Sequence, residues 1–149
     1  MKSGTYYENL EIDRSLALIG EDKKTTIIDG GKDRTVIQIN RDLVSITGLT
    51  IRNGESSLPF VPMGGAGIRL SNADYCNISG NTISANDYGI DLKASHNNNI
   101  FNNNITDNWF AGVYLDLSSN NNLPFSLISL LYTSGCREET VCHDARAEE

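Results

Sequence analysis

Apolar and polar residues alternate over short stretches along most of this chain. Branched aliphatic residues recur at every second position, and glycine or polar residues separate one stretch from the next. A period of two predicts short, half-buried strands, and no stretch keeps a helical period long enough to compete. The clearest pairs are Leu10 and Ile12, Leu16 and Leu18, Ile37 and Ile39, and Val44 and Ile46. The pattern therefore predicts an all-β fold.

Two stretches of the chain align with each other at an offset of 22 or 23 residues. Residues 77–92 and 99–115 both contain Asn-Ile, Asn, Ile and Asn, followed by Gly-aliphatic-x-Leu. A unit this short cannot bury a core alone, so its apolar positions are satisfied only when copies stack into a solenoid. Ile28 falls on Ile51 in the same register. We therefore expect a parallel β-helix over residues 1–123, with about four to five rungs of about three short strands each.

The asparagines of the repeat fall at the predicted corners between strands. Asparagine tolerates left-handed backbone conformations at a corner and bonds neighbouring backbone groups. Because the same corner recurs in every rung, the side-chain amides can bond from one rung to the next. We expect two such structural ladders, formed by Asn81 over Asn103 and by Asn86 over Asn108.

One rung contains an insertion. Residues 46–51 align with residues 78–83 at an offset of 32, whereas Gly67 aligns with Gly89 at an offset of 22. About ten residues have therefore been added, and residues 55–65 are that insertion. Its two prolines and its glycine pair indicate a corner loop, which is where solenoids usually carry binding residues.

The repeat is lost at Pro124, which cannot donate to a strand ladder. Residues 124–149 have no asparagine corners and become polar and charged. This atypical tail is either a cap over the open end of the core or a non-native extension. The abrupt change of composition favours the extension.

Alternation sends two rows of polar side chains out of one predicted sheet. The first row is Gln38, Arg69, Asp91 and Tyr114, and the second is Asn40, Ser71, Lys93 and Asp116. A guanidinium beside a carboxylate and a tyrosine ring suits sugar hydroxyls and uronate carboxylates. A solvated sheet face would look the same, with opposite charges on adjacent rungs contributing about 0.2–1 kcal/mol per pair. The candidate ligand-binding residues are Gln38, Arg69, Asp91, Lys93, Tyr114 and Asp116.

Catalysis is the weaker interpretation of these rows, and we assign no catalytic residue. Asp91 and Asp116 could have the separation of an inverting glycosidase pair, but Arg69 and Lys93 would hold both carboxyls ionised. A lyase would need an acidic cluster for calcium and a basic proton acceptor. The spacing shows no compact acidic cluster, and His96 is expected to be a solvated turn residue. No cofactor is expected, and calcium is relevant only to the lyase alternative.

Composition limits the possible partners. The 149 residues carry a net charge of −7 and no cluster of Lys and Arg, which argues against nucleic acid. No window approaches the roughly 18 apolar residues of a membrane span, and residues 1–8 lack the apolar stretch of a signal peptide. Cys76 stands at a repeat position and is expected to be buried. Cys136, Cys142 and His143 are better explained as free side chains in the tail than as a zinc site or a disulfide.

The repeat is similar to that of a known group of β-helices. Residues 76–92 resemble the right-handed parallel β-helix repeats of the NosD-type and carbohydrate-binding and sugar-hydrolase group, in the pectin-lyase-like superfamily. Residues 4–10 and 18–30 resemble the first coils of such proteins, so the resemblance covers about residues 4–123. It implies a right-handed helix and an exported or surface-attached parent protein.

The resemblance also has departures. This group usually has a capping segment and a further strand before its first Gly-Thr-Tyr motif, whereas this chain starts at that motif. We therefore expect a fragment, truncated at both ends, whose exposed end rungs would favour self-association. The copper-handling description attached to part of the group transfers poorly, because His96, His143, Met1 and Met63 form no repeated ligand set.

The expected function is non-catalytic binding of a polysaccharide or a cell-surface glycan. The polar sheet face and the corner insertion would provide the binding surface. One alternative is a polysaccharide lyase or glycoside hydrolase whose catalytic coils are missing from this chain. A purely structural rod without a ligand is the other.

Overall fold

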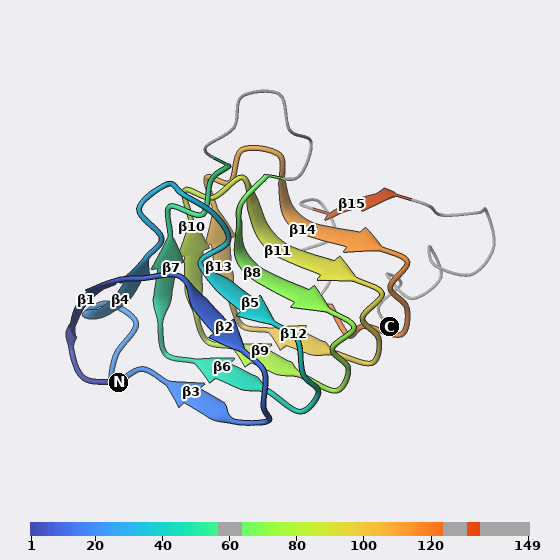
Figure 1. Cartoon of the computed structure of the whole chain (residues 1–149), viewed down its shortest axis with the longest axis horizontal. Coiled ribbons are helices and arrows are strands. Elements are labelled where there is room, and N and C mark those ends of the chain that lie inside the picture. Colours follow the sequence, from blue (N-terminus) through green and yellow to red (C-terminus); the bar gives the residue numbers. More distant parts are fainter. Residues whose placement is uncertain (57–63, 124–130, 135–149) are drawn as a thin grey trace.

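The chain winds into a right-handed parallel β-helix whose rungs stack along one axis (Figure 1). The computed structural model describes residues 1–56, 64–123 and the backbone of residues 131–134. Every paired strand lies parallel to its neighbour one rung away, and the strands form three sheets. This confirms the fold predicted from the two-residue alternation and the repeat.

Each sheet takes one short strand from each successive rung. The first sheet contains β1 (Gly4–Tyr7), β4 (Thr26–Asp29), β7 (Thr50–Arg52), β10 (Thr82–Ser84) and β13 (Asn104–Thr106). The second contains β2 (Leu10–Ile12), β5 (Ile37–Ile39), β8 (Ala66–Ser71), β11 (Tyr88–Lys93), β14 (Ala111–Asp116) and β15 (Leu131–Ser134). The third contains β3 (Ala17–Ile19), β6 (Ser45–Thr47), β9 (Asn77–Ser79) and β12 (Asn99–Phe101).

The core is a set of aliphatic columns that run along the helix axis. In the first sheet Ile28 pairs with Ile51, and Ile83 pairs with both Ile51 and Ile105. All four side chains are buried, and the inward residues of the other two sheets complete the same core. Because fully burying one such side chain contributes about 1.5–3 kcal/mol, these columns hold the strands in register.

Asparagine ladders close two of the corners. Asn81 donates from Nδ2 to Asn103 Oδ1 over 3.1 Å, and Asn86 donates to Asn108 Oδ1 over 3.0 Å. Each side chain also accepts from the preceding rung, where Gly54 N–H lies 2.8 Å from Asn86 Oδ1. The amides therefore satisfy backbone groups that no strand partner reaches at a corner.

A further ladder lies at the third corner. The backbone N–H of Cys76 donates to Asn98 Oδ1 over 2.8 Å, and the backbone N–H of Asn98 donates to Asn121 Oδ1 over 2.9 Å. Ser95 and Ser118 repeat the arrangement, with a 3.0 Å bond from Ser95 N–H to Ser118 Oγ. Cys76 ends the asparagine column, and its side chain is buried as the repeat predicted.

The glycine of the Gly-aliphatic-x-Leu motif is required by the spacing of the rungs. A Cβ atom on Gly89 would lie 2.4 Å from the carbonyl oxygen of Gly112 and 2.8 Å from the Ile105 side chain. These separations are shorter than van der Waals contacts, so a larger residue would push the rungs apart. The motif therefore marks a place where the backbone itself is packed against its neighbour.

The insertion leaves the helix between β7 and β8. Thirteen residues, 53–65, connect these two strands, whereas only three residues, 85–87, connect β10 and β11. Asp87 holds the base of the insertion, because its Oδ2 accepts from the backbone N–H groups of Ser56 and Gly65, each over 2.9 Å. Residues 57–63 lie outside the described part of the chain.

The second sheet extends into the tail. β15 pairs in parallel with β14, with Leu131 opposite Val113 and Tyr132 opposite Tyr114. Loss of the repeat at Pro124 therefore does not end this sheet, and the boundary of the tail stays a prediction. Cys136, Cys142 and His143 lie outside the described residues. Within the described ranges, the chain has no helix with the length and apolar character needed to cross a bilayer.

Candidate functional site

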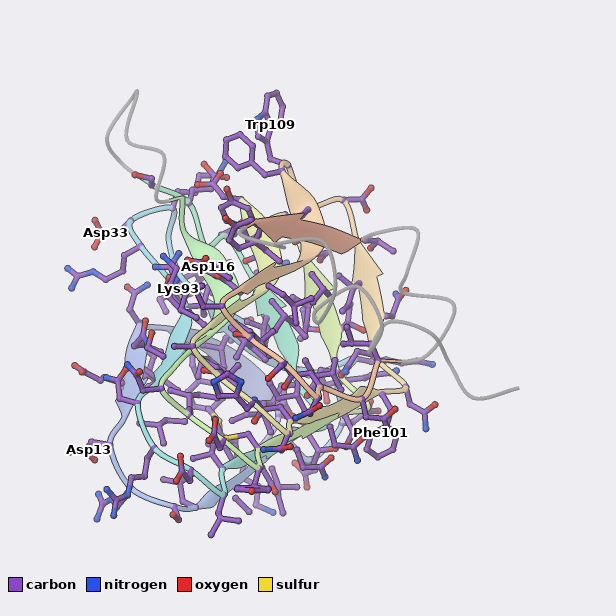
Figure 2. All side chains as sticks on the ribbon, turned by 90° about the vertical axis from the view of Figure 1, so that its right-hand side faces the viewer. Asp13, Asp33, Lys93, Phe101, Trp109 and Asp116 are labelled. Carbon is purple, nitrogen blue, oxygen red and sulfur yellow. The ribbon has the colours of Figure 1, made fainter. Side chains whose placement is uncertain are left out.

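The two polar rows lie on the outer face of the second sheet, in the order that the repeat predicts. In the first row Arg69 pairs with Gln38 on one side and with Asp91 on the other, and Asp91 pairs with Tyr114. In the second row Lys93 stands between Ser71 and Asp116. Figure 2 shows Lys93 and Asp116 together on this face. We call the surface formed by both rows the polar face.

Asp91 differs from the expectation of a solvated side chain. Asp91 is only 1% exposed, although it stands in the outward row. Arg69 Nε donates to Asp91 Oδ2 over 2.6 Å, and Lys93 Nζ lies 3.9 Å from the same oxygen. The long side chains of the two cations lie over the shorter carboxylate, which removes it from water. Oδ1 of Asp91 has no hydrogen-bond partner among the described residues.

Arg69 joins the polar face to the insertion. Besides its bond to Asp91, it donates from Nη2 to the carbonyl oxygen of Gly64 over 2.7 Å. Gly64 is the last residue but one before β8, so this bond holds the returning end of the insertion against the sheet. The Arg69 side chain is 15% exposed. The positive charge of Arg69 is therefore already paired within the protein.

Gln38 lies in a network of polar side chains at the other end of the face. Its Nε2 donates to Asn40 Oδ1 over 2.8 Å and to Ser71 Oγ over 3.0 Å. Asn40 in turn donates to Glu11 Oε1 over 2.8 Å. These bonds connect the two rows across neighbouring rungs. A cavity of about 330 Å³ opens beside them, between Gln38, Arg69 and the base of the insertion.

Aromatic residues missed by the sequence analysis border the polar face. The ring centroid of Tyr88 lies 5.3 Å from that of Phe110 and 5.2 Å from that of Tyr114. Burial raises the pKa of the Tyr88 phenol, and the nearby Tyr114 and Asp91 act in the same direction. The phenol therefore stays protonated at neutral pH. The signal was available, since Tyr88 and Phe110 fall at the same corner of consecutive rungs.

A second cavity lies at this corner, beside the base of the insertion. It has a volume of about 720 Å³, and Trp109 and Phe110 form its aromatic wall. Apart from Ala85, the remaining lining is polar and includes Glu55, Asp87 and Asp107. Trp109 projects from the upper corner in Figure 2. We call this cavity the corner groove.

Comparison with known proteins places the chain in a family. The family model described as "Periplasmic copper-binding protein (NosD)" matches residues 4–128, most of the chain. The chain belongs to the NosD family. The parallel stacking of the three sheets in this chain agrees with that assignment. Neither a curated protein nor a solved structure matches the chain.

The described side chains of this NosD-family protein do not fit a copper site. No group of three or more His, Cys, Asp and Glu side chains gathers within residues 1–56 and 64–123. His96 is half-buried rather than solvated, and its Nδ1 accepts from the backbone N–H of Ser119 over 3.1 Å. Burial raises the pKa of the Cys76 thiol, which disfavours the thiolate that binds metals. Soft copper ligands are therefore not brought together in this part of the chain.

Proposed function

We propose that this NosD-family protein is exported and binds a carbohydrate on the polar face without cleaving it. The observation that supports this most directly is the contact of the Tyr88 and Tyr114 rings beside the Arg69–Asp91–Lys93 group. A sugar has apolar C–H faces as well as hydroxyl groups. Aromatic rings next to fixed polar groups match both features. The family description as periplasmic supports the proposed export.

The burial of Asp91 supports binding rather than hydrolysis. An acid catalyst has to come within hydrogen-bond distance of the glycosidic oxygen. The Asp91 side chain is 2% exposed, and Arg69 occupies one of its oxygens at 2.6 Å. Asp91 is therefore placed to organise the polar face rather than to reach a substrate.

Screening the purified chain against immobilised neutral and acidic polysaccharides tests this proposal. We expect at least one class to bind, and Tyr114→Ala to weaken binding about tenfold, the usual effect of removing a central aromatic contact. Tyr75→Ala is a matched control, because Tyr75 is 61% exposed and lies outside the polar face. Absence of binding to every polysaccharide would contradict the proposal and favour a structural rod. Release of reducing ends or of unsaturated products would favour the enzymatic alternative.

A further inference from the structure

We infer that the carbohydrate is a linear chain of uncharged sugars that enters the corner groove at Trp109 and continues onto the polar face. This inference rests on the proposed function and specifies its ligand. Three observations carry it: the exposure of the corner aromatics, the line of ring contacts that leads away from them, and the charge of the groove.

The corner presents its aromatic rings on a firmly held backbone. Trp109 is 80% exposed and Phe110 is 59% exposed. The two residues are neighbours in the chain and line the same groove. Their backbone N–H groups donate to the carbonyl oxygens of Asn86 and Asp87, each over 2.8 Å. The preceding rung therefore fixes the backbone of both residues. Adjacent exposed aromatics on a fixed corner are typical of a recognition surface.

The rings continue from the groove onto the polar face. Phe110 stacks on Tyr88 with an angle of 29° between the ring planes, and Tyr88 contacts Tyr114 on the next rung at 46°. Tyr114 stands opposite Asp91 in the first polar row. This line of contacts connects two surfaces that would otherwise be separate. A linear polymer could place successive C–H faces along it, whereas a single small sugar would cover only one end.

The charge of the groove favours uncharged sugars. Among the described residues, three carboxylates line it, from Glu55, Asp87 and Asp107, against one ammonium group, from Lys32. That ammonium is paired with Glu55 over 3.0 Å. A uronate would meet an excess of like charge here, whereas a hydroxyl group can donate to a carboxylate.

The polar face adds little attraction for an acidic sugar. Its arginine, Arg69, is held by Asp91 and by the carbonyl oxygen of Gly64. Lys93 lies 3.9 Å from Asp91 as well. A uronate would have to compete with these partners for both cations. A neutral hydroxyl group can form hydrogen bonds with these polar groups and leave their ion pairs in place.

Trp109 supplies a direct test, because it is the only tryptophan of the chain. The protein would be titrated with hexasaccharides of glucose, mannose and xylose, with the matching disaccharides, and with hexagalacturonate. We expect a neutral hexasaccharide to change the tryptophan fluorescence and to bind more tightly than its disaccharide. In calorimetry, Trp109→Ala should weaken this binding about tenfold or more, and Trp109→Phe should restore part of it. Raising the salt concentration should change the affinity little, because the ligand carries no charge.

Tyr75→Ala is again the matched control, because this tyrosine is exposed but lies at a different corner. Circular dichroism of each variant verifies that it has folded. Tighter binding of hexagalacturonate, or binding of a neutral hexasaccharide that Trp109→Ala leaves unchanged, would overturn the inference and leave the proposed function standing. If calorimetry detects binding of no sugar at all, both are overturned.

Discussion

Asn81 is the side chain whose removal should destabilise the β-helix most clearly. It is fully buried at a corner. Its Oδ1 accepts from the backbone N–H of Leu49 over 3.1 Å. Its Nδ2 lies 3.0 Å from the carbonyl oxygen of Ile46 and 3.1 Å from Asn103 Oδ1. One amide therefore bonds to the rung before it and the rung after it.

The cost of Asn81→Ala follows from these bonds. The buried N–H of Leu49 would lose its acceptor, which costs about 1–3 kcal/mol, and the lost donor to Ile46 adds about 1 kcal/mol. We expect a total loss of about 3 kcal/mol. This is a large part of the 5–15 kcal/mol by which a domain is typically stable. Asn81→Asp should cost at least as much, because it places a carboxylate oxygen against three oxygen atoms, those of Ile46, Ser79 and Asn103 to which Nδ2 now donates.

Urea unfolding followed by far-ultraviolet circular dichroism measures this loss. The midpoint should fall while the slope stays unchanged, since the fold and its exposed area on unfolding are the same. Asn104→Ala is the matched control, because this asparagine lies on the adjacent rung with an exposed side chain. The reasoning is refuted if Asn81→Ala loses less than about 1 kcal/mol, or no more than the control.

Three other properties can be tested. Leu43 is 65% exposed and has a φ of 62°, a region that costs most residues about 1–2 kcal/mol, so Leu43→Asn should raise the urea midpoint. Burial opposes ionisation of Asp29, but hydrogen bonds led by that from Asn53 outweigh it and lower the pKa of the carboxyl. Its stabilising effect is present above the unfolded pKa, about 3.9, and is lost as the pH falls through the lower folded value. Asp29→Asn should therefore reduce the loss of stability in acid titrations. Cys76 is buried with a raised pKa, so a thiol reagent should modify it only as fast as the chain unfolds. An unchanged urea midpoint of Leu43→Asn would contradict the first prediction, and an unchanged acid profile of Asp29→Asn would contradict the second. Rapid labelling of Cys76 itself in the folded chain, as distinct from Cys136 and Cys142, would contradict the third.

The alternation of apolar and polar residues predicted part of the candidate site. The alternation of strand residues placed Arg69, Asp91 and Tyr114 in one row, because a strand sends every second side chain to the same face. It did not reveal that Asp91 is buried. That burial depends on how far the Arg69 side chain extends over it and on the return of the insertion at Gly64. Both are contacts across rungs, which a pattern of apolar and polar positions does not contain.

The corner groove shows a similar limit. Trp109 and Phe110 stand outside the Gly-aliphatic-x-Leu motif, so the repeat assigned them no role. Only the stacking of rungs brings Phe110 against Tyr88 and places Asp87 beside the groove. A comparison of the same corner in consecutive rungs would have shown that it is rich in aromatic residues.

The sequence by itself determined the parallel β-helix, because a 22-residue unit with aliphatic columns and asparagine corners can be satisfied only by stacking. Tertiary structure decided which polar side chains are accessible. In a solenoid, neighbours on the surface are one rung apart, and the reach of a long side chain decides which of them it covers. Asp91 and Trp109 show the two results of this covering: the carboxylate side chain of Asp91 is buried, and the aromatic ring of Trp109 is exposed to water.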